Sequence, residues 1–310
     1  MTPTLVFYSQ FDSFEEWQAL LAPLLPGVRI CQEQDVEDPQ SVLYALAWKP
    51  PLGFFARYTN LQLLVNLGAG VDSLVGRDDL PNVPITRVSD PDMGRMMASY
   101  VLFAVLRYAR DIPALERAQR ERRWHYLHPR LPSSVRVGVL GLGELGSYAA
   151  LELVRQGFDV RGWSRSAKTL ENVTCVSGLE NLDAFLASSD ILVVMLPLTP
   201  QTQGLLNAER LALLPRGSCF INVSRGAVVD QQALTAALIS GQIGEATLDV
   251  FDREPLPPED PLWALDNVLI TPHLASVAIP ATTAAQIADN IHRLARGEAV
   301  LHQVDPARGY

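Results

Sequence analysis

The sequence predicts an α/β fold built from two doubly wound parallel sheets, and three observations carry this prediction. Short runs of β-branched residues alternate with helical patterns along nearly the whole chain, as in parallel sheets whose strands are joined by crossover helices. The alternation pauses at the proline- and serine-containing segment 129–134 and then restarts with longer, more apolar strands. The length of 310 residues is sufficient for two well-formed cores.

The first domain is predicted to begin with strands and to lead into a long helix. Its apolar runs predict strands at 4–8, 42–48, 62–66 and 85–88. Helical periodicity predicts one helix at 14–25 and a longer one at 92–109. Pro113 should break or kink the chain soon after the longer helix.

The second domain repeats the alternation after the break. Strands are predicted at 135–140, 159–163, 191–196, 218–223, 246–250 and 268–271, and helices at 145–156, 182–187, 208–214 and 231–240. Asn207 and Asp230 stand where helix N-caps are expected, and Gly157 and Gly241 where helices should end. A last helix at 282–295 follows the final strand and is expected to rejoin the first domain. The domains are therefore predicted at 1–100 plus 283–310 and at 101–282.

The composition excludes several classes of protein. Hydrophobic residues make up 48% and charged residues 19% of the chain, which is ordinary for a globular protein, and the net charge of -9 argues against nucleic-acid binding. Cys31, Cys175 and Cys219 are odd in number and form no CxxC or Cys/His cluster, so we expect a reducing compartment and no metal site. No signal peptide or membrane span is visible, which makes the cytoplasm the default location and a membrane partner unexpected.

A glycine-rich turn, GLGELG, follows the strand VRVGVL and opens an amphipathic helix. In this context the pattern GxGxxG predicts a dinucleotide site of the Rossmann type. Gly141 permits the tight turn, Gly143 lets backbone amides approach a pyrophosphate, and Gly146 lets helix and strand pack closely. Glu144 and Leu145 belong to the helix N-terminus, which stabilises the anion. A βα turn without a ligand is the alternative that we favour less.

The second strand of this domain ends in polar residues at the point where the adenosine ribose is expected. An NAD site usually places Asp or Glu there, to accept from the ribose 2′-hydroxyl. This chain instead has Ser164, Arg165 and Ser166, with Lys168 close by. Because arginine and hydroxyl groups bind a phosphate that a carboxylate would repel, we expect NADP(H) as the preferred cofactor, with NAD(H) possible. An exposed polar loop without this role is the alternative.

Three polar residues follow later strands of the same domain. Arg225 follows CFINVS, Glu254 lies in the loop DREPLPPED after TLDVF, and His273 follows NVLIT. Open parallel sheets bind their ligands at the carboxyl ends of the strands. Each residue alone has an ordinary explanation, as a surface arginine, a loop glutamate or a capping histidine. All three at the same edge favour a reactive site.

Several segments resemble one family, the D-isomer-specific 2-hydroxyacid dehydrogenases. They are GLGELG, LPLTPQTQGLLN, NVSRGAVVD, LDVFDREPLP and TPHLAS, which match in order and spacing, and the loop LGAGVD in the first domain. AWKPP, LDVFDREPLPPEDPLW and the tail QVDPARGY are similar to the glyoxylate/hydroxypyruvate reductase A branch of that family. The resemblance covers essentially the whole chain. It implies a Rossmann-type cofactor domain inserted into a flavodoxin-like substrate domain, with a cleft between them.

The resemblance also implies a reaction and a role for each polar residue. The chain would reduce small 2-keto acids, glyoxylate and hydroxypyruvate, to glycolate and D-glycerate with NADPH. Arg225 would hold the keto acid by its carboxylate and polarise its keto oxygen. His273 would act as the general acid that protonates the developing alkoxide, and Glu254 would pair with it and orient its ring.

Further contacts follow from the same resemblance. The amides of Ala69, Gly70 and Val71 would bind the substrate carboxylate, and Trp48 is a candidate wall of the substrate pocket, with core packing as its alternative. The remaining residues would contact the cofactor: Asp249 and Ser276 at the nicotinamide carboxamide, and Leu196 and Pro197 near a ribose. For Leu196 and Pro197, a strand end that needs no ligand is the alternative. The helices around 92–120 would form a homodimer interface.

Two alternatives to this function remain. The first is another D-2-hydroxyacid dehydrogenase, of the lactate or phosphoglycerate type. The second is a nicotinamide-sensing binding protein without catalysis on the same scaffold, since such proteins can keep Arg225, Glu254 and His273. The absence of extended low-complexity tails favours an enzyme.

Overall fold

The chain forms two compact units in the computed structural model, which describes residues 2–80 and 82–305. Unit 1 comprises Met1–Met93 and Val277–Tyr310, and unit 2 comprises Gly94–Ser276. These boundaries lie a few residues before the predicted ones, and the first falls inside a helix, where no linker composition marks it. The end of the tail QVDPARGY, residues 306–310, lies outside the described residues.

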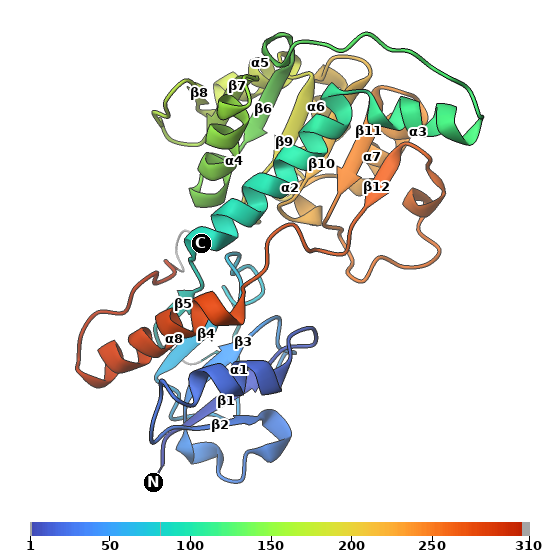
Figure 1. Cartoon of the computed structure of the whole chain (residues 1–310). Coiled ribbons are helices and arrows are strands. Elements are labelled where there is room, and N and C mark those ends of the chain that lie inside the picture. Colours follow the sequence, from blue (N-terminus) through green and yellow to red (C-terminus); the bar gives the residue numbers. More distant parts are fainter. Residues whose placement is uncertain (1, 81, 306–310) are drawn as a thin grey trace. The chain divides into compact units, whose positions relative to one another are not determined.

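Unit 1 contains a parallel sheet with the strand order β2-β1-β3-β4-β5, which is the flavodoxin-like order (Figure 1). Its strands are β1 (Thr4–Tyr8), β2 (Arg29–Gln32), β3 (Val42–Ala47), β4 (Leu63–Asn66) and β5 (Ile85–Arg87). Its helices are α1 (Phe14–Leu21), α8 (Pro280–Ala295) and the 3-10 turns Glu33–Asp35 and Pro39–Ser41.

Helix α8 belongs to unit 1 although it follows the last strand of unit 2 along the chain. It buries Ala284, Ile287, Ala288 and Ile291, whose spacing places them on one helix face, and it contacts α1 (Figure 1). Gln286 of α8 also bonds the backbone beside β5, accepting from the Ser89 amide and donating to the carbonyl of Arg87. The burial of this apolar face is what returns the chain to unit 1.

Unit 2 contains a larger parallel sheet with the order β12-β11-β10-β9-β6-β7-β8. This is the Rossmann order with one further strand, and its topological switch point lies between β6 and β9. The strands are β6 (Arg136–Leu140), β7 (Asp159–Ser164), β8 (Thr174–Ser177), β9 (Ile191–Val194), β10 (Ser218–Asn222), β11 (Ile243–Leu248) and β12 (Val268–Ile270). The predicted class, two parallel α/β sheets, is confirmed.

Helices cover both faces of this second sheet. They are α2 (Pro91–Ala109, beginning in unit 1), α3 (Ile112–Arg120), α4 (Glu144–Arg155), α5 (Leu182–Ala187), α6 (Ala208–Leu213), α7 (Gln231–Ile239) and the 3-10 turns Pro132–Ser134, Leu179–Asn181, Gly226–Val228 and Pro261–Ala264. Helices α2 and α4 share one buried apolar cluster with the sheet, and α5, α6 and α7 share another. The sheet is therefore buried on both sides, as its continuous apolar strands require.

Two strands, β2 and β8, are absent from the sequence prediction. Each has four residues, RICQ in β2 and TCVS in β8, of which only two are apolar, so neither gives the apolar run from which the other strands were predicted. The predicted caps are confirmed: Asn207 accepts from the Arg210 amide and Asp230 from the Ala233 amide. Pro113 lies in the first turn of α3, and the break falls at Asp111, whose φ is +54°.

Two further features concern the surroundings of the chain. The three cysteines carry free thiols. Among the helices of residues 2–80 and 82–305, none has both the length and the apolar character that crossing a membrane requires.

Candidate active site

The polar residues predicted in the second domain lie in loops at one edge of the sheet of unit 2. These loops follow the carboxyl ends of β6, β7, β9, β10, β11 and β12 (Figure 1). Since all the strands are parallel, their carboxyl ends lie at this same end of the sheet, which we call its carboxyl edge. The switch point between β6 and β9 opens there.

The three glycines of the turn after β6 differ in their surroundings. Two of them are crowded by backbone atoms and one faces open space. A β-carbon on Gly141 would lie 2.6 Å from the carbonyl oxygen of Met195, and one on Gly146 would lie 1.9 Å from the carbonyl oxygen of Gly141. Gly141 also has a φ of +118°, which L side chains rarely adopt. A β-carbon on Gly143 would meet nothing within 4 Å. Neither packing nor backbone conformation therefore explains glycine at 143.

Helix α4 begins directly at this open position. Its N-cap is Gly143, and no side chain caps it, in contrast to α6 and α7. Glu144 and Leu145 form its first turn, with Glu144 exposed. The exposed glycine and the uncapped helix start form a cradle of the kind that binds a pyrophosphate. The residues present thus fit a dinucleotide.

The loop after β7 carries cations and hydroxyls and no carboxylate between residues 164 and 170. Ser164 is buried, and its hydroxyl donates to the carbonyl of Ser166 at 2.8 Å, which folds the loop back on itself. Arg165 and Lys168 are exposed at the same strand end.

His273 and Glu254 lie in direct contact, although 19 residues separate them. Glu254 Oε2 lies 2.8 Å from His273 Nδ1, while Glu254 Oε1 accepts from the Phe251 amide at 3.1 Å. Both side chains keep between a fifth and a quarter of their surface exposed. A carboxylate fixed at one oxygen and bonded to Nδ1 with the other orients the ring and leaves Nε2 to carry the transferable proton.

Arg225 is presented by a turn that a buried asparagine holds. Asn222 accepts from the Ser224 amide at 3.1 Å and donates to the carbonyl of Arg225 at 3.1 Å. The Arg225 guanidinium itself donates to the carbonyl of Ser224 at 2.7 Å. Its neighbour Gly226 touches the backbone of Phe251, where a β-carbon would lie 1.9 Å from the carbonyl carbon.

These contacts join the loop of Arg225 to the loop that leads to Glu254. Neither Asn222 nor Gly226 was predicted from the sequence, although an asparagine at a strand end and a glycine directly after a candidate arginine are typical of a constrained turn.

Asp249 is buried, and its carboxylate accepts three hydrogen bonds within the protein. Its carboxylate accepts from the Thr271 hydroxyl at 2.6 Å and from the amides of Leu274 and Ala275, both at 2.9 Å. It therefore holds the turn that carries His273, a function that the sequence analysis did not foresee. Ser276 lies just beyond this turn, partly exposed.

Leu196 and Pro197 follow β9. Leu196 is buried, whereas Pro197 is exposed and its carbonyl accepts from the Thr202 hydroxyl at 2.6 Å.

Unit 1 carries the remaining predicted residues in the loop after β4. The buried Asn66 side chain donates to the carbonyls of Gly68 and Gly70, at 2.7 and 2.9 Å. Within the described ranges, the backbone amides of residues 69–71 donate no hydrogen bond to another part of the protein. Trp48 lies on this loop, since a β-carbon on Gly68 would overlap its ring at 2.2 Å. The loop can thus offer amides to an anion.

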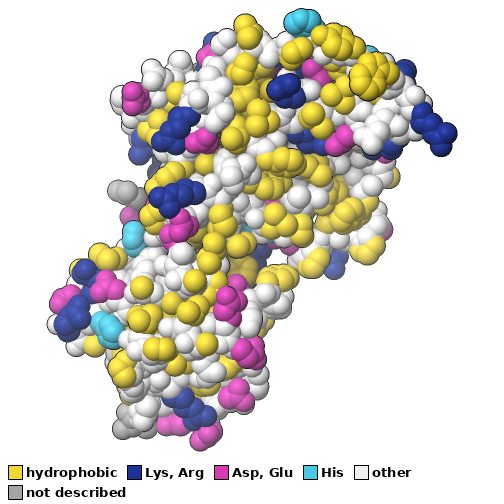
Figure 2. Space-filling model, viewed as in Figure 1, with side chains coloured by type: hydrophobic (Ala, Val, Ile, Leu, Met, Phe, Trp, Pro, Cys, Tyr) yellow, Lys and Arg dark blue, Asp and Glu magenta, His cyan; other side chains and the backbone are white. Residues whose placement is uncertain are grey.

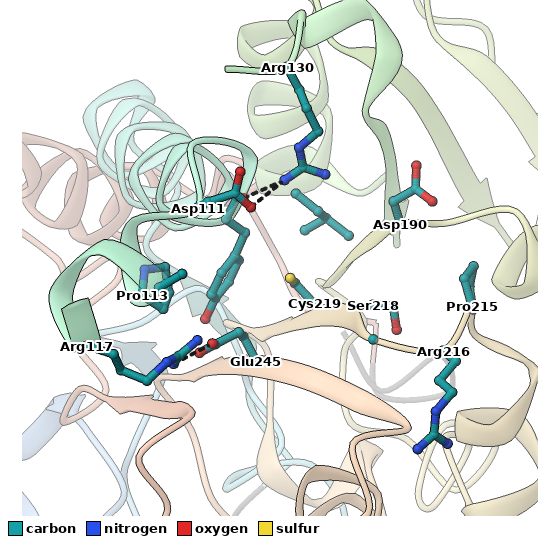
Figure 3. A pocket seen from close by; sticks show the side chains of 14 residues that line it. Asp111, Pro113, Arg117, Arg130, Asp190, Pro215, Arg216, Ser218, Cys219 and Glu245 are labelled. Carbon is teal, nitrogen blue, oxygen red and sulfur yellow. Dashed lines mark hydrogen bonds and ion pairs between the residues drawn. The ribbon is translucent and has the colours of Figure 1, made fainter. Parts of the chain in front are cut away.

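A cavity of about 300 Å³ lies at the other end of the unit 2 sheet, where the strands begin (Figure 3). It is lined by the first residues of β9 and β10 and by Glu245 of β11. Two ion pairs join lining residues, Arg117 with Glu245 at 2.8 Å and Arg130 with Asp111 at 3.2 Å (Figure 3). Burial raises the pKa of Glu245 and that of the Cys219 thiol, the latter to about 12. This cavity shares no residue with the candidate site.

The sequence is similar to known proteins of one kind, both in a family model and in whole-chain relatives. A sequence model described as "D-isomer specific 2-hydroxyacid dehydrogenase, NAD binding domain" matches residues 102–275. The chain is 38% identical to a glyoxylate/hydroxypyruvate reductase A from Yersinia enterocolitica, over 99% of each chain.

Solved structures agree with these matches. A D-isomer specific 2-hydroxyacid dehydrogenase from Xanthobacter autotrophicus Py2, in complex with NADPH and MES, is 64% identical with a TM-score of 0.95 over 100% of each chain. An NADPH-dependent glyoxylate/hydroxypyruvate reductase from Sinorhizobium meliloti, with NADP and sulfate, is 35% identical with a TM-score of 0.93 over 99% of this chain and 100% of that one.

Proposed function

The chain belongs to the D-isomer-specific 2-hydroxyacid dehydrogenases, a family of nicotinamide-dependent oxidoreductases, and we propose that it reduces glyoxylate and hydroxypyruvate with NADPH. The products would be glycolate and D-glycerate. The observation that carries this proposal is the pair His273–Glu254 beside the loop of Arg225, on a sheet edge that also carries the open glycine cradle. The relatives named above act on the same keto acids or were crystallised with the same cofactor.

The cofactor assignment depends on two features of unit 2. The open space at Gly143 and the uncapped start of α4 would receive the pyrophosphate, with Gly141, Glu144, Leu145 and Gly146 shaping the turn. The exposed Arg165, with Ser164 and Ser166, would bind the 2′-phosphate of NADPH. NADH lacks this phosphate and should bind more weakly. Asp249 and Ser276 would contact the nicotinamide carboxamide, and Leu196 and Pro197 a ribose.

The chemistry follows from the charges of the reactive side chains. When bound, the reduced nicotinamide supplies the hydride. His273 would donate its Nε2 proton to the alkoxide that forms at C2, while Glu254 stabilises the imidazolium. Arg225, a planar and permanently charged fork, would bind the substrate carboxylate and polarise the keto oxygen.

Unit 1 would contribute substrate contacts. The amides of Ala69, Gly70 and Val71 would bind the substrate carboxylate, because Asn66 holds the neighbouring carbonyls and leaves these amides without protein partners. Trp48, which covers Gly68, would limit the size of the substrate. In this proposal unit 1 is the substrate-binding domain and unit 2 the dinucleotide-binding domain.

The test is a set of initial rates with NADPH and NADH against glyoxylate, hydroxypyruvate, pyruvate and 2-ketobutyrate. We expect the highest kcat/KM with NADPH and one of the first two acids. Faster turnover of pyruvate would favour the lactate-type alternative. Tight NADPH binding without turnover of any of the four acids would favour a nicotinamide-sensing protein.

We also propose that the chain forms a homodimer through unit 2. Phe103 and Leu106 of α2 are exposed, as are Trp124 and Tyr126 in the segment after α3, of which Trp124 is 95% exposed. Hydrophobic side chains gather on the face of unit 2 that carries α2 (Figure 2). Light scattering should give about twice the chain mass of 34.0 kDa, and Trp124→Ser should shift the protein towards monomer. A monomeric wild type would contradict this assignment.

A further inference from the structure

A line of hydrogen bonds in unit 2 runs from helix α2 to the turn that carries His273. The Tyr100 hydroxyl lies 2.6 Å from Thr271 Oγ1, and Thr271 Oγ1 donates to Asp249 Oδ1 at 2.6 Å. Because the single hydroxyl proton of Thr271 goes to the carboxylate, Tyr100 must be the donor to Thr271. Burial raises the pKa of Tyr100 to about 12, so the phenol keeps the proton that it donates.

Asp249 collects three consecutive amides of the turn. The backbone amide of His273 donates to the Asp249 carbonyl at 2.9 Å, and the amides of Leu274 and Ala275 donate to its carboxylate. His273 itself has a φ of +55°, a conformation that costs a residue with a β-carbon free energy. A turn in this conformation persists only when its surroundings hold it, and Asp249 contributes to this by accepting from three consecutive backbone amides.

We propose that Tyr100 and Thr271 are positioning residues for His273, acting through Asp249. This inference rests on the proposed role of His273 as the general acid. The two hydroxyls fix the rotamer of the Asp249 carboxylate, and the carboxylate fixes the backbone from which the imidazole projects. Loss of either hydroxyl lets the carboxylate turn, lengthens its bonds to Leu274 and Ala275, and displaces the imidazole from the reacting oxygen.

The same helix provides a matched control. The Tyr108 hydroxyl of α2 lies 2.6 Å from Oγ1 of Thr247 in β11, so this second pair has the same groups and the same distance, although it is fully buried whereas the Tyr100–Thr271 pair is partly buried. It makes no bond to Asp249 or to the turn at 273–275. Tyr100→Phe and Tyr108→Phe remove the same hydroxyl from the same helix, and only the first one touches the line to His273.

The experiment compares kcat, KM for glyoxylate and the melting temperature in Tyr100→Phe, Thr271→Val, Thr271→Ser and Tyr108→Phe, all with NADPH. We expect kcat to fall about tenfold in Tyr100→Phe and by one to two orders of magnitude in Thr271→Val, since a displaced catalytic group costs rate steeply. KM should change little. Thr271→Ser should keep most of the rate because it keeps the hydroxyl. Tyr108→Phe should keep wild-type kcat while lowering the melting temperature at least as much as Tyr100→Phe does, because its pair is more deeply buried.

Three other results would contradict the proposal or the function on which it rests. Equal kcat in Tyr100→Phe and Tyr108→Phe would make both pairs merely structural. Wild-type turnover of Tyr100→Phe, with His273→Ala inactive, would overturn the positioning role and leave the proposed function intact. Full turnover of His273→Ala would overturn the proposed function and this inference with it. If Thr271→Val does not fold, Tyr100→Phe and Thr271→Ser still decide.

Discussion

Two contacts and one backbone conformation set the position of His273, and each has a different physical role. Glu254 orients the ring through Nδ1, Asp249 fixes the backbone amide, and the positive φ aims the side chain out of the turn. None of these residues belongs to the glycine cradle of the proposed cofactor site. A substitution at His273 can therefore change the rate of proton transfer without changing the affinity for NADPH.

The first prediction concerns the general acid. His273→Ala should lower kcat on glyoxylate by about 10²–10⁴-fold, the usual contribution of general acid catalysis. The dissociation constant for NADPH, measured by fluorescence titration, should stay close to that of the wild type. His292→Ala, in the exposed part of α8, is the control and should keep full activity. Matching losses of NADPH affinity and turnover would remove His273 from the acid role.

The second prediction concerns cofactor selectivity. Arg165→Ala should weaken NADPH binding about tenfold or more, since a charge-assisted hydrogen bond to phosphate is worth roughly 1.5–3 kcal/mol, and it should leave NADH nearly unchanged. Titration with both cofactors measures the difference. Arg155→Ala removes an exposed arginine that pairs with Glu152 on α4, and it should affect neither cofactor. A similar response of both cofactors to Arg165→Ala would refute the 2′-phosphate assignment.

At the scale of elements, the turn between β6 and α4 contains glycines needed for two different reasons. Gly141 and Gly146 are required by the protein itself, since atoms of its own backbone occupy the space of a β-carbon. At Gly143 that space is open. Gly141 and Gly146 are thus needed for the fold, whereas Gly143 is needed for the proposed binding of the cofactor. Mutation of single glycines can distinguish these two needs.

The third prediction separates these requirements. Gly143→Ala should fold with a melting temperature close to that of the wild type but bind NADPH at least about tenfold more weakly, because its methyl group enters the pyrophosphate cradle. Gly146→Ala should lower the melting temperature by several degrees without cofactor, since helix and strand must separate. Unchanged NADPH affinity in Gly143→Ala would show that the open space is not a cofactor site.

The fourth prediction concerns acid stability of unit 1. The Asp79 carboxylate accepts from Arg77 at 2.7 and 2.8 Å and from the Gly53 amide at 2.8 Å, and the hydrogen bonds from Arg77 contribute most to lowering the pKa of Asp79 to about 2. A lowered pKa stabilises the fold above the unfolded value of about 4, and this contribution disappears as pH falls through about 2. It amounts to the order of 2 kcal/mol.

Asp79→Asn should therefore lower the free energy of unfolding at neutral pH and flatten its fall between about pH 4 and pH 2. Chemical unfolding across this range measures the effect. Glu37→Gln breaks the exposed pair of Glu37 with Arg29 and should leave both the free energy of unfolding and its pH dependence nearly unchanged, as solvent screens surface pairs. A pH dependence as steep in Asp79→Asn as in the wild type would exclude Asp79 as its source.

At the scale of the whole molecule, the chain order and the spatial order differ. Unit 2 is inserted into unit 1, and α8 returns to pack on α1 after the last strand of unit 2 is complete. The sequence predicted most elements because burial on both faces of a parallel sheet demands continuous apolar strands and periodic helices. It missed β2 and β8, whose sequences RICQ and TCVS each contain only two apolar residues and so carry a weak pattern.

The alternation of apolar strands with helical patterns was enough to determine the fold class. The mid-chain glycine turn, the polar ends of the strands and the order of motifs were enough to determine the family and the candidate reactive residues. These features are local, and each residue type has a chemical reason at its position. Only the tertiary structure decided that Asp249 holds the turn of His273, that Asn222 holds the turn of Arg225, and that Tyr100 bonds Thr271 across 171 residues of chain. Such contacts leave no periodicity, because they depend on how distant elements pack and not on the spacing of residues within one element.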